Sequence, residues 1–351
     1  MPKTITIKQI AKMAGVSPGT VDRVLHNRGK VSPENLEKIS RILEDHSYHA
    51  NIHKSALSLR KSFRILLFIP RYTAGSYWDG QIRGFEMGIR EYSDIDIVAD
   101  KLTYDQYDVH SFIETSSQAL SMKPDGIILG PTFRRETIDF CHKLEKEKIP
   151  YVFVDTIIPE TSPVARFAPD QRRSGLLLSN ILDLICEKDK SLLIVNPKRL
   201  GSESFNTIER EEAIREAYSA HGIADRLKML DLSMQDSDFA IILRDYLNDN
   251  PDVGIIAVPN SRANEIAACL DSDHVGRLKI GGYDLTDGNR ECLMNESISF
   301  ILDQKPEQQA FQALKALLSY LIFGRVHESL ENEIKIEVIF RENCINPLKN
   351  T

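Results

Sequence analysis

The sequence lacks long hydrophobic runs and the common catalytic and phosphate-binding motifs. Within its 351 residues, no stretch approaches the roughly 18 consecutive apolar residues that a membrane-spanning helix needs. No P-loop or H-E-x-x-H pattern is present, and the histidines are not spaced for metal binding. We therefore expect a protein that is not an enzyme, with no membrane association, no catalytic residues, no metal site and no cofactor.

The N-terminus also lacks the apolar segment of a signal peptide. The run MPKTITIKQIAKMAG carries polar residues every few positions, so we expect the protein to stay in the cytosol. The cysteines fit that compartment because they form no C-x-x-C pair and no metal-ligand spacing. They are predicted to be reduced and mostly buried; the five are Cys141, Cys186, Cys269, Cys292 and Cys344.

Charge is distributed unevenly along the chain. Residues 1–61 hold eleven Lys and Arg against five Asp and Glu, a net charge of +6, whereas the rest holds 33 against 46, a net charge of −13. A small basic end on an acidic body predicts that one end meets a polyanion while the body stays away from it. Chance clustering of the charges is the alternative. The length itself suits two or three domains.

The basic end shows the start and stop signals of three short helices. Gly15 follows an apolar pattern over 7–14 and suits the positive φ that ends a helix. Ser17 and Pro18 resemble the cap and first residue of a second helix, predicted to end near Asn27. A serine–proline start at 32–33 begins a third helix. This arrangement predicts a helix-turn-helix unit closed by a third helix.

The run ITIKQIAKMAGVSPGTVDRVLHN, followed by VSPENLEKISRILEDHSYHAN, resembles the headpiece of the lactose-repressor (LacI/GalR) family of transcription regulators. The similarity covers residues 5–59 almost without gaps, and its motif is highly specific. It implies a DNA-binding headpiece over 1–50 and a hinge helix over 51–62. Because paired hinges enter the DNA together in this family, it also implies a homodimer on a near-palindromic operator.

The resemblance places the N-terminal part of the second helix in the major groove. Arg23 is the candidate for gripping guanine O6 and N7, with a phosphate contact as the alternative. Asp22 either accepts from a cytosine amine or steers Arg23. In the hinge, Leu57 is expected to wedge into a base step, unless it is an ordinary packing leucine. The predicted DNA contacts are Thr6, Ser17, Pro18, Gly19, Thr20, Asp22, Arg23, Asn27, Lys54 and Leu57.

Some of these positions depart from the family pattern. Pro18 and Gly19 stand where relatives carry polar or aromatic readers, and neither side chain can hydrogen-bond a base. Asp22 replaces a small hydroxyl residue, and Lys54 stands where relatives often have alanine. These departures leave DNA binding as the expectation but change the operator sequence that we expect.

From residue 63 onward, apolar runs alternate with amphipathic helical stretches, which predicts parallel sheets covered on both faces. The pattern resembles the family's periplasmic-binding-protein-like sensor. It implies an α/β, type I two-lobed sensor domain over 63–345, with lobe 1 at about 63–160 and 305–324 and lobe 2 at about 161–303 and 328–345. Strands are predicted at 63–70, 95–100, 125–131, 150–155, 191–197, 227–232, 253–259, 278–284 and 299–304.

Gly80, Gly84 and Gly88 recur every four residues on the first predicted helix of the sensor. That spacing favours close backbone packing against this helix. It is not a dinucleotide-binding fingerprint, which needs G-x-G-x-x-G directly after a strand. The predicted fold class is therefore a small all-α helix-turn-helix headpiece plus a two-lobed sensor domain with parallel sheets.

Ligands of open parallel sheets bind at the carboxyl ends of the strands. Carried over from the family, the predicted effector contacts are Tyr72, Tyr77, Trp78, Asp155, Arg210, Asn260, Asp284 and Gln304. Trp78, the only tryptophan, is expected to stack on a sugar, with an ordinary interface or surface role as the alternative. Arg210 is expected to offer a donor fork to the ligand, or else to be a solvated charge. Asp155 has a helix-cap or turn role as its alternative.

The donors and acceptors around an aromatic group favour a polyhydroxylated ligand. A sugar is the first choice, followed by a sugar acid, a phosphosugar or a nucleobase-like ligand. Ser261 replaces a family aspartate, so we expect a ligand that differs from those of the best-known relatives. The sequence thus predicts a ligand-responsive repressor of carbohydrate-utilisation genes. The alternatives are an enzyme that uses the strand-end carboxylates, and a DNA-binding regulator whose sensor answers to a non-sugar effector or a protein partner.

Overall fold

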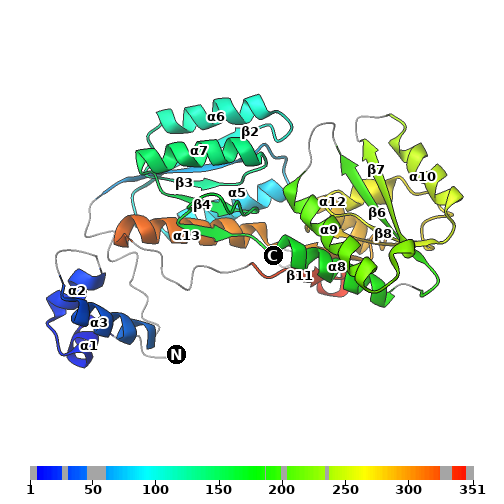
Figure 1. Cartoon of the computed structure of the whole chain (residues 1–351). Helices are drawn as coiled ribbons and strands as arrows, with labels where there is room; N and C mark the ends of the chain where they lie inside the picture. The colour runs from blue at the N-terminus through cyan, green and yellow to red at the C-terminus, as the bar shows by residue number, and fades with distance from the viewer. Residues whose placement is uncertain are drawn as a thin grey trace.

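The computed structural model describes residues 6–25, 31–45, 61–185, 187–198, 204–233, 237–324 and 334–344 (Figure 1). The predicted DNA contacts Asn27, Lys54 and Leu57 lie outside these residues, as do Cys186 and most of the predicted hinge. Within the described ranges, no helix is long and apolar enough to cross a membrane.

Three short helices form the headpiece: α1 (Ile7–Ala14), α2 (Pro18–Leu25) and α3 (Pro33–Asp45). The hydroxyl of Thr6 accepts from the backbone N–H of Gln9, whose side chain accepts from the backbone N–H of Thr6, so α1 has a reciprocal cap. Gly15 ends α1 with a φ of 68°. The helices share one small apolar core, whose buried members are Ile10, Ala11, Val21, Val24 and Ile39.

The first lobe is a parallel five-stranded sheet between two helical layers, with strand order β2-β1-β3-β4-β5. Helices α5 and α13 pack on one face, and α6 and α7 pack on the other (Figure 1). The strands are β1 (Phe63–Pro70), β2 (Ile97–Tyr104), β3 (Gly126–Leu129), β4 (Tyr151–Val154) and β5 (Ala165–Phe167). The helices are α5 (Tyr77–Glu91), α6 (Val109–Ser121), α7 (Arg134–Glu147) and α13 (Pro306–Phe323).

The second lobe has a six-stranded sheet with order β11-β10-β9-β8-β6-β7, in which β11 runs antiparallel to β10. Helices α8 and α9 cover one face, and α10, α11 and α12 cover the other. The strands are β6 (Ser191–Lys198), β7 (Leu227–Ser233), β8 (Val253–Ala257), β9 (Lys279–Tyr283), β10 (Phe300–Asp303) and β11 (Glu337–Ile339). The helices are α8 (Gln171–Ile185), α9 (Phe205–Ala220), α10 (Phe239–Asp249), α11 (Ala263–Ala268) and α12 (Asp287–Met294), with short 3₁₀ turns at Ala224–Arg226 and Arg341–Asn343.

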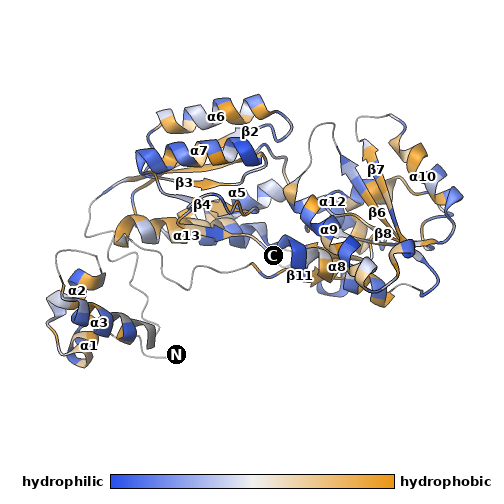
Figure 2. Ribbon diagram, viewed as in Figure 1, coloured by the Kyte–Doolittle hydropathy of each residue, from blue (hydrophilic) through white to orange (hydrophobic). Residues whose placement is uncertain are grey.

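The continuous apolar runs of the sequence are strands that are buried on both faces. In β1, Ile65 and Leu67 point to the layer of α5 and α13, whereas Leu66 and Phe68 point to the layer of α6 and α7. Successive side chains of a strand alternate between faces, so a strand covered on both sides needs apolar residues at every position. Figure 2 shows the resulting pattern, with apolar strands inside and hydrophilic stretches on the outer helices. The expected fold class is confirmed.

The structure differs from the predicted elements where the sequence has no continuous apolar run to mark a buried strand. Strand β2 runs over Ile97–Tyr104 rather than 95–100, because it is an edge strand with many exposed positions and no continuous apolar run. Strand β5 (Ala165–Phe167) pairs with β4 in the first sheet, although the second lobe was expected to begin at about 161. It is only three residues long, which is too short to produce a recognisable pattern.

The three regularly spaced glycines of α5 pack against the N-terminal half of α13, as their spacing predicted. A Cβ on Gly80 would lie 2.5 Å from the ring of Pro306. At Gly84 it would lie 2.7 Å from the carbonyl carbon and Cα of Glu307, which are backbone atoms. At Gly88 it would meet a methyl group of Leu314 at 2.7 Å. The missing side chains let the two helices approach closely and fix the position where α13 enters the first lobe.

Gly84→Ala is expected to lower the free energy of unfolding of the sensor by about 1–3 kcal/mol, because a backbone cannot rotate away from the added methyl group. Gly88→Ala is the matched control, since it meets only the end of a leucine side chain and is expected to cost less. Urea unfolding followed by circular dichroism compares the two variants. Equal losses would contradict a backbone clash at Gly84.

Candidate functional site

A cleft of about 1130 Å³ lies between the two lobes and is lined by residues from both. All of the predicted effector contacts line it: Tyr72, Tyr77, Trp78, Asp155, Arg210, Asn260, Asp284 and Gln304. They come from the carboxyl ends of strands and from the loops and helix starts that follow, where open parallel sheets place their ligands. The structure therefore brings together residues that lie up to 232 positions apart in the chain, from Tyr72 to Gln304.

Two aspartates occupy equivalent positions at the floor of the cleft, one in each lobe. Asp155 follows β4 and Asp284 follows β9, with φ values of 70° and 67°. The N–H of Asp155 donates to Phe167 and that of Asp284 donates to Leu302, each across to the next strand of its own sheet. Left-handed backbone is unfavourable for residues other than glycine, although aspartate tolerates it better than most. The two strands thus turn sharply, and both carboxylates point into the cleft.

Asp155 is almost fully buried and makes hydrogen bonds to both lobes. Its Oδ1 accepts from the Tyr77 hydroxyl at 2.7 Å, and its Oδ2 accepts from Asn206 Nδ2 of the second lobe at 3.0 Å. Thr156 Oγ1 also donates to Oδ2, at 3.1 Å. Burial raises the pKa of Asp155 above its ordinary value, although these hydrogen bonds and the charge of Arg210 oppose the rise.

Asp284 is the second buried carboxylate, and it has fewer partners. Gln304 Nε2 donates to its Oδ1 at 2.7 Å, while its Oδ2 accepts no hydrogen bond from the described part of the chain. Burial raises the pKa of Asp284 to about 7, while Arg210 and Gln304 act in the opposite direction. This oxygen is therefore available to a donor that enters the cleft.

Arg210 lies beneath these carboxylates and is only 2% exposed. Its Nε and Nη2 donate to Gln171 Oε1 at 2.8 and 2.5 Å, and Nη2 also donates to Gln304 Oε1 at 2.7 Å. Its Nη1 donates to the Pro259 carbonyl at 2.8 Å, and its guanidinium stacks 3.8 Å above the ring of Tyr283. A guanidinium has five N–H groups, so these contacts leave one of them for a ligand. Most of the Arg210 N–H groups that were predicted to contact the ligand instead donate to Gln171 and Gln304 and orient their side chains.

The aromatic residues of the cleft differ in how much surface they present. Tyr72 is 38% exposed, whereas Trp78 is 8% exposed. Trp78 packs so closely on Gly130 that a Cβ there would lie 2.6 Å from the indole ring. Most of the indole therefore lies in the core of the first lobe, and only part of it faces the cleft. Tyr77 is buried as well, and burial raises its hydroxyl pKa well above the ordinary value.

Several buried polar residues around the cleft were not predicted from the sequence. Gln309 of α13 accepts from the Asp155 N–H at 2.8 Å and donates to the Gln304 carbonyl at 2.8 Å. Gln171 bonds Arg210, and Asn206 bonds Asp155. Gln171 begins α8, and Gln309 lies in the first turn of α13, each just after the chain passes between the lobes. A polar residue at a crossover is the one signal in the sequence that points to them.

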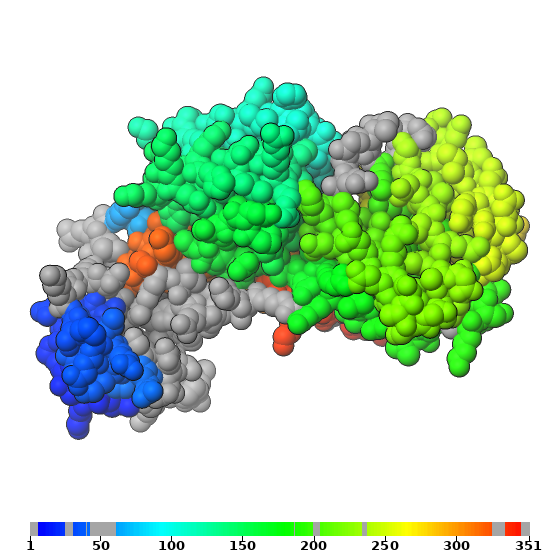
Figure 3. Space-filling view, in the orientation of Figure 1, coloured from blue at the N-terminus to red at the C-terminus, as the bar shows by residue number. Residues whose placement is uncertain are grey.

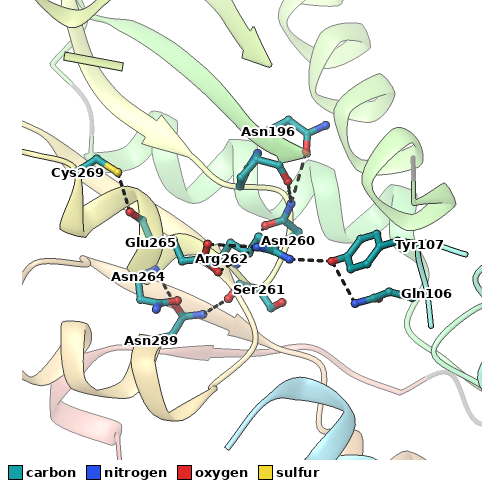
Figure 4. A network of polar contacts seen from close by, with 11 residues as sticks. Gln106, Tyr107, Asn196, Asn260, Ser261, Arg262, Asn264, Glu265, Cys269 and Asn289 are labelled. Carbon is teal, nitrogen blue, oxygen red and sulfur yellow. Dashed lines mark hydrogen bonds and ion pairs between the residues drawn. The ribbon is translucent and has the colours of Figure 1, made fainter. Parts of the chain in front are cut away.

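Asn260 lies in the loop that follows β8 and is hydrogen-bonded both to β6 and within its own loop. Its Nδ2 donates to the Pro197 carbonyl at 3.4 Å, and its Oδ1 accepts from the Arg262 N–H at 3.1 Å (Figure 4). Ser261, at the family's aspartate position, also lines the cleft. The cleft therefore has an amide and a hydroxyl here in place of an amide and a carboxylate.

In the headpiece, the packing of α2 decides which of its residues face outward. Val21 and Val24 are buried in the small core, so Pro18, Gly19 and Arg23 are exposed on the other side of the helix. The hydroxyl of Ser17 accepts from the Thr20 N–H at 3.1 Å and caps the helix. Asp22 is half-buried, and Thr6 is exposed at the start of α1. The predicted contacts that are described thus lie along α2, at its N-terminal cap and at the start of α1.

Comparisons with known proteins agree with this architecture. Residues 65–325 match the family described as "Periplasmic binding protein domain", and residues 6–51 match "Bacterial regulatory proteins, lacI family". A putative LacI transcriptional regulator from Bacteroides fragilis has a similar structure, with a TM-score of 0.76 and 29% identity over 81% of this chain and 98% of that one.

Two curated relatives are also similar in sequence. One is the probable HTH-type transcriptional repressor ExuR of Bacillus subtilis (strain 168), 29% identical over 163 residues, which are 44% of each chain. The other is the HTH-type transcriptional regulator IdnR of Escherichia coli (strain K12), 25% identical over 256 residues, which are 71% of each. The chain thus spans less than half the length of the first of these relatives.

Asp284→Asn is expected to raise the free energy of unfolding at pH 8 by at most about 4 kcal/mol. The folded protein holds the Asp284 proton up to a pKa of about 7, whereas the ordinary value is 3.8. Wild-type stability from this group therefore falls as the pH rises from about 4 to 7. The asparagine keeps an acceptor for Gln304 but has no charge, so its advantage disappears toward pH 4.

Thermal unfolding between pH 4 and pH 8 measures this difference. Asp189→Asn, in an exposed turn, is the matched control and is expected to follow the wild type at every pH. A difference between Asp284→Asn and the wild type that does not change with pH would contradict the buried charge.

Proposed function

Because this chain belongs to the lacI family of bacterial regulatory proteins, we propose that it represses carbohydrate-utilisation genes until a sugar-like effector binds in the cleft. The headpiece binds operator DNA, and the two-lobed domain senses the effector. The observation that supports an effector most directly is the pair of buried aspartates, Asp155 and Asp284, which face one cleft from opposite lobes.

The headpiece has the features that DNA binding requires. The exposed residues of α2 precede and flank Arg23, whose side chain is free to extend from the helix surface. An N-terminal segment with a net charge of +6 attracts phosphates and releases counterions on binding. The rest of the chain has a net charge of −13, which is repelled by the phosphates and keeps the sensor away from the duplex. A homodimer presents two copies of α2 to successive major grooves of a near-palindromic site.

The chemistry of the cleft favours a ligand with several hydroxyl groups. Asp155 and Asp284 form no ion pair with a described residue, and one oxygen of Asp284 has no hydrogen-bond donor among those residues. With the nearby amides, these buried groups offer acceptors and donors to a ligand. Each hydroxyl of a bound sugar needs such a partner, because an unsatisfied buried polar group costs free energy. Tyr72 offers an exposed aromatic face for the C–H groups of a sugar.

The cleft also bears on the alternative of a sensor that answers to a protein partner. That alternative predicts an occluded or apolar cleft, whereas this cleft has a volume of about 1130 Å³ and has charged and amide groups on its walls. A small-molecule effector is therefore the better-supported proposal. The effector acts by binding one arrangement of the lobes more tightly than the other, and by reciprocity DNA changes the effector affinity by the same factor.

Arg23→Ala is expected to weaken binding to the preferred duplex, selected from a random library with the full-length protein, by about 1–3 kcal/mol and to relax the preference at one base position. A phosphate contact would instead weaken all duplexes alike and lower the salt slope by about 1. Arg41→Ala, exposed on α3, is the matched control and is expected to retain the base preference. Selection that enriches no duplex at low salt would refute DNA recognition.

A thermal-shift panel of neutral sugars, sugar acids, phosphosugars and nucleobases is expected to reveal at least one stabilising polyhydroxylated compound, because a ligand that binds only the folded state raises its melting temperature. Asp155→Asn and Asp284→Asn are expected to reduce that shift. If no compound stabilises the protein while DNA selection succeeds, the sensor responds to a partner of another kind.

A further inference from the structure

A hydrogen bond joins two residues that line the cleft, one from each lobe (Figure 4). Tyr107 follows β2 in the first lobe, and Arg262 precedes α11 in the second. Arg262 Nη2 donates to the Tyr107 hydroxyl at 2.7 Å, and Gln106 Nε2 donates to the same oxygen at 3.2 Å. The Arg262 side chain is 23% exposed, so this bond is more shielded from water than an ordinary surface contact.

Contacts within the second lobe orient the Arg262 side chain toward the first lobe. Glu265 accepts from Nη1 at 3.2 Å with both of its oxygens, and the backbone N–H of Arg262 donates to Asn260. The loop itself is fixed by Asn289, a fully buried residue of α12 whose Nδ2 donates to the Ser261 carbonyl at 3.0 Å. The guanidinium is thus oriented before it meets Tyr107, which reduces the entropy lost when the lobes come together.

A second contact between the lobes involves the same helix, α12. The backbone N–H of Asp287 donates to the carbonyl of Gly75 in the first lobe at 3.0 Å. Gly75 has a φ of 75°, and its own N–H donates to Asp79 Oδ2 at 3.0 Å. A Cβ on Gly75 would lie 2.9 Å from the Cβ of Asp287 and closer still to its carboxyl group. Only glycine permits this approach of the two lobes.

We propose that the bonds Tyr107–Arg262 and Gly75–Asp287 form an interlobe latch that holds the cleft closed before an effector arrives. The two contacts are mechanically linked, because α12 carries Asp287 and, through Asn289, braces the loop of Arg262. In the space-filling view the two lobes meet along a common border (Figure 3). This inference deepens the proposed function, since it assigns to residues outside the predicted effector set the control of the same cleft.

The latch sets how strongly the cleft responds to its ligand. The apparent affinity of a site that is competent only when closed scales with the closed fraction. Contacts that the protein makes with itself raise that fraction, and they also require an opening step before a ligand enters or leaves. Tyr107, Arg262, Gly75 and Asp287 are therefore positioning residues, which act on the ligand by setting the separation of the lobes.

Hydrogen exchange of the full-length protein, with no ligand or DNA added, tests the latch. The Asp287 amide is the donor of the second contact, so the peptide covering residues 284–290 reports lobe opening. Gly75→Ala is expected to speed its exchange by roughly threefold or more, since the lobes can no longer approach. Gly222→Ala is the matched control: its φ is 69°, and a Cβ there meets nothing within 4 Å. It is expected to leave that peptide unchanged.

Tyr107→Phe tests the link between the contacts without altering any glycine. It removes the hydroxyl that Arg262 contacts, and it is expected to speed exchange in the peptide 284–290, which it does not touch. Tyr246→Phe, on α10, is the control and is expected to have no effect there. The latch is refuted if exchange in this peptide is the same in Gly75→Ala, Tyr107→Phe and the controls. Failure of DNA selection or of the ligand panel would leave this result intact, so the two proposals fail separately.

Discussion

The arrangement of the sensor depends on the burial of two carboxylates at the junction of its lobes. Asp155 and Asp284 are 7% and 5% exposed, and neither forms an ion pair with a described residue. Burying a carboxylate is costly unless hydrogen bonds replace its hydration. Nearby amides and hydroxyls replace only part of it, which is why the pKa of Asp284 rises to about 7. The cleft therefore contains buried carboxylate oxygens that can still accept hydrogen bonds from a ligand.

The hydrogen bonds that hold these carboxylates also connect the two lobes. Gln304 lies where the chain passes from β10 to α13, accepts from Arg210 and donates to Asp284. One turn into α13, Gln309 contacts both the Gln304 carbonyl and the Asp155 N–H. A change in the separation of the lobes therefore changes the partners of both aspartates. Under the proposed function, these hydrogen bonds couple ligand binding to lobe movement.

The headpiece and the sensor differ in the size of their apolar cores and in the sign of their net charge. The headpiece has a small apolar core that serves only to turn the exposed side of α2 outward, and its basic charge attracts DNA without regard to sequence. The sensor holds its strand ends in register with an apolar core on each face of both sheets. Its net negative charge opposes attraction to a polyanion. Among the described residues of α2, Arg23 is exposed, and it is the residue that we propose contacts a base.

The sequence by itself determined the headpiece helices and the alternating strands, because caps and periodicity are local signals that short segments carry. The effector residues were predicted from the family resemblance, and the structure places them all along one cleft. The tertiary structure decided the rest. It turned Arg210 toward Gln171 and Gln304, placed Gln309 beside Asp155, added β5 to the first sheet, and brought Gly75 against Asp287. These contacts join residues that are far apart in the chain, and each depends on how two packed lobes meet. No local pattern encodes that geometry, since it follows from the packing of whole layers.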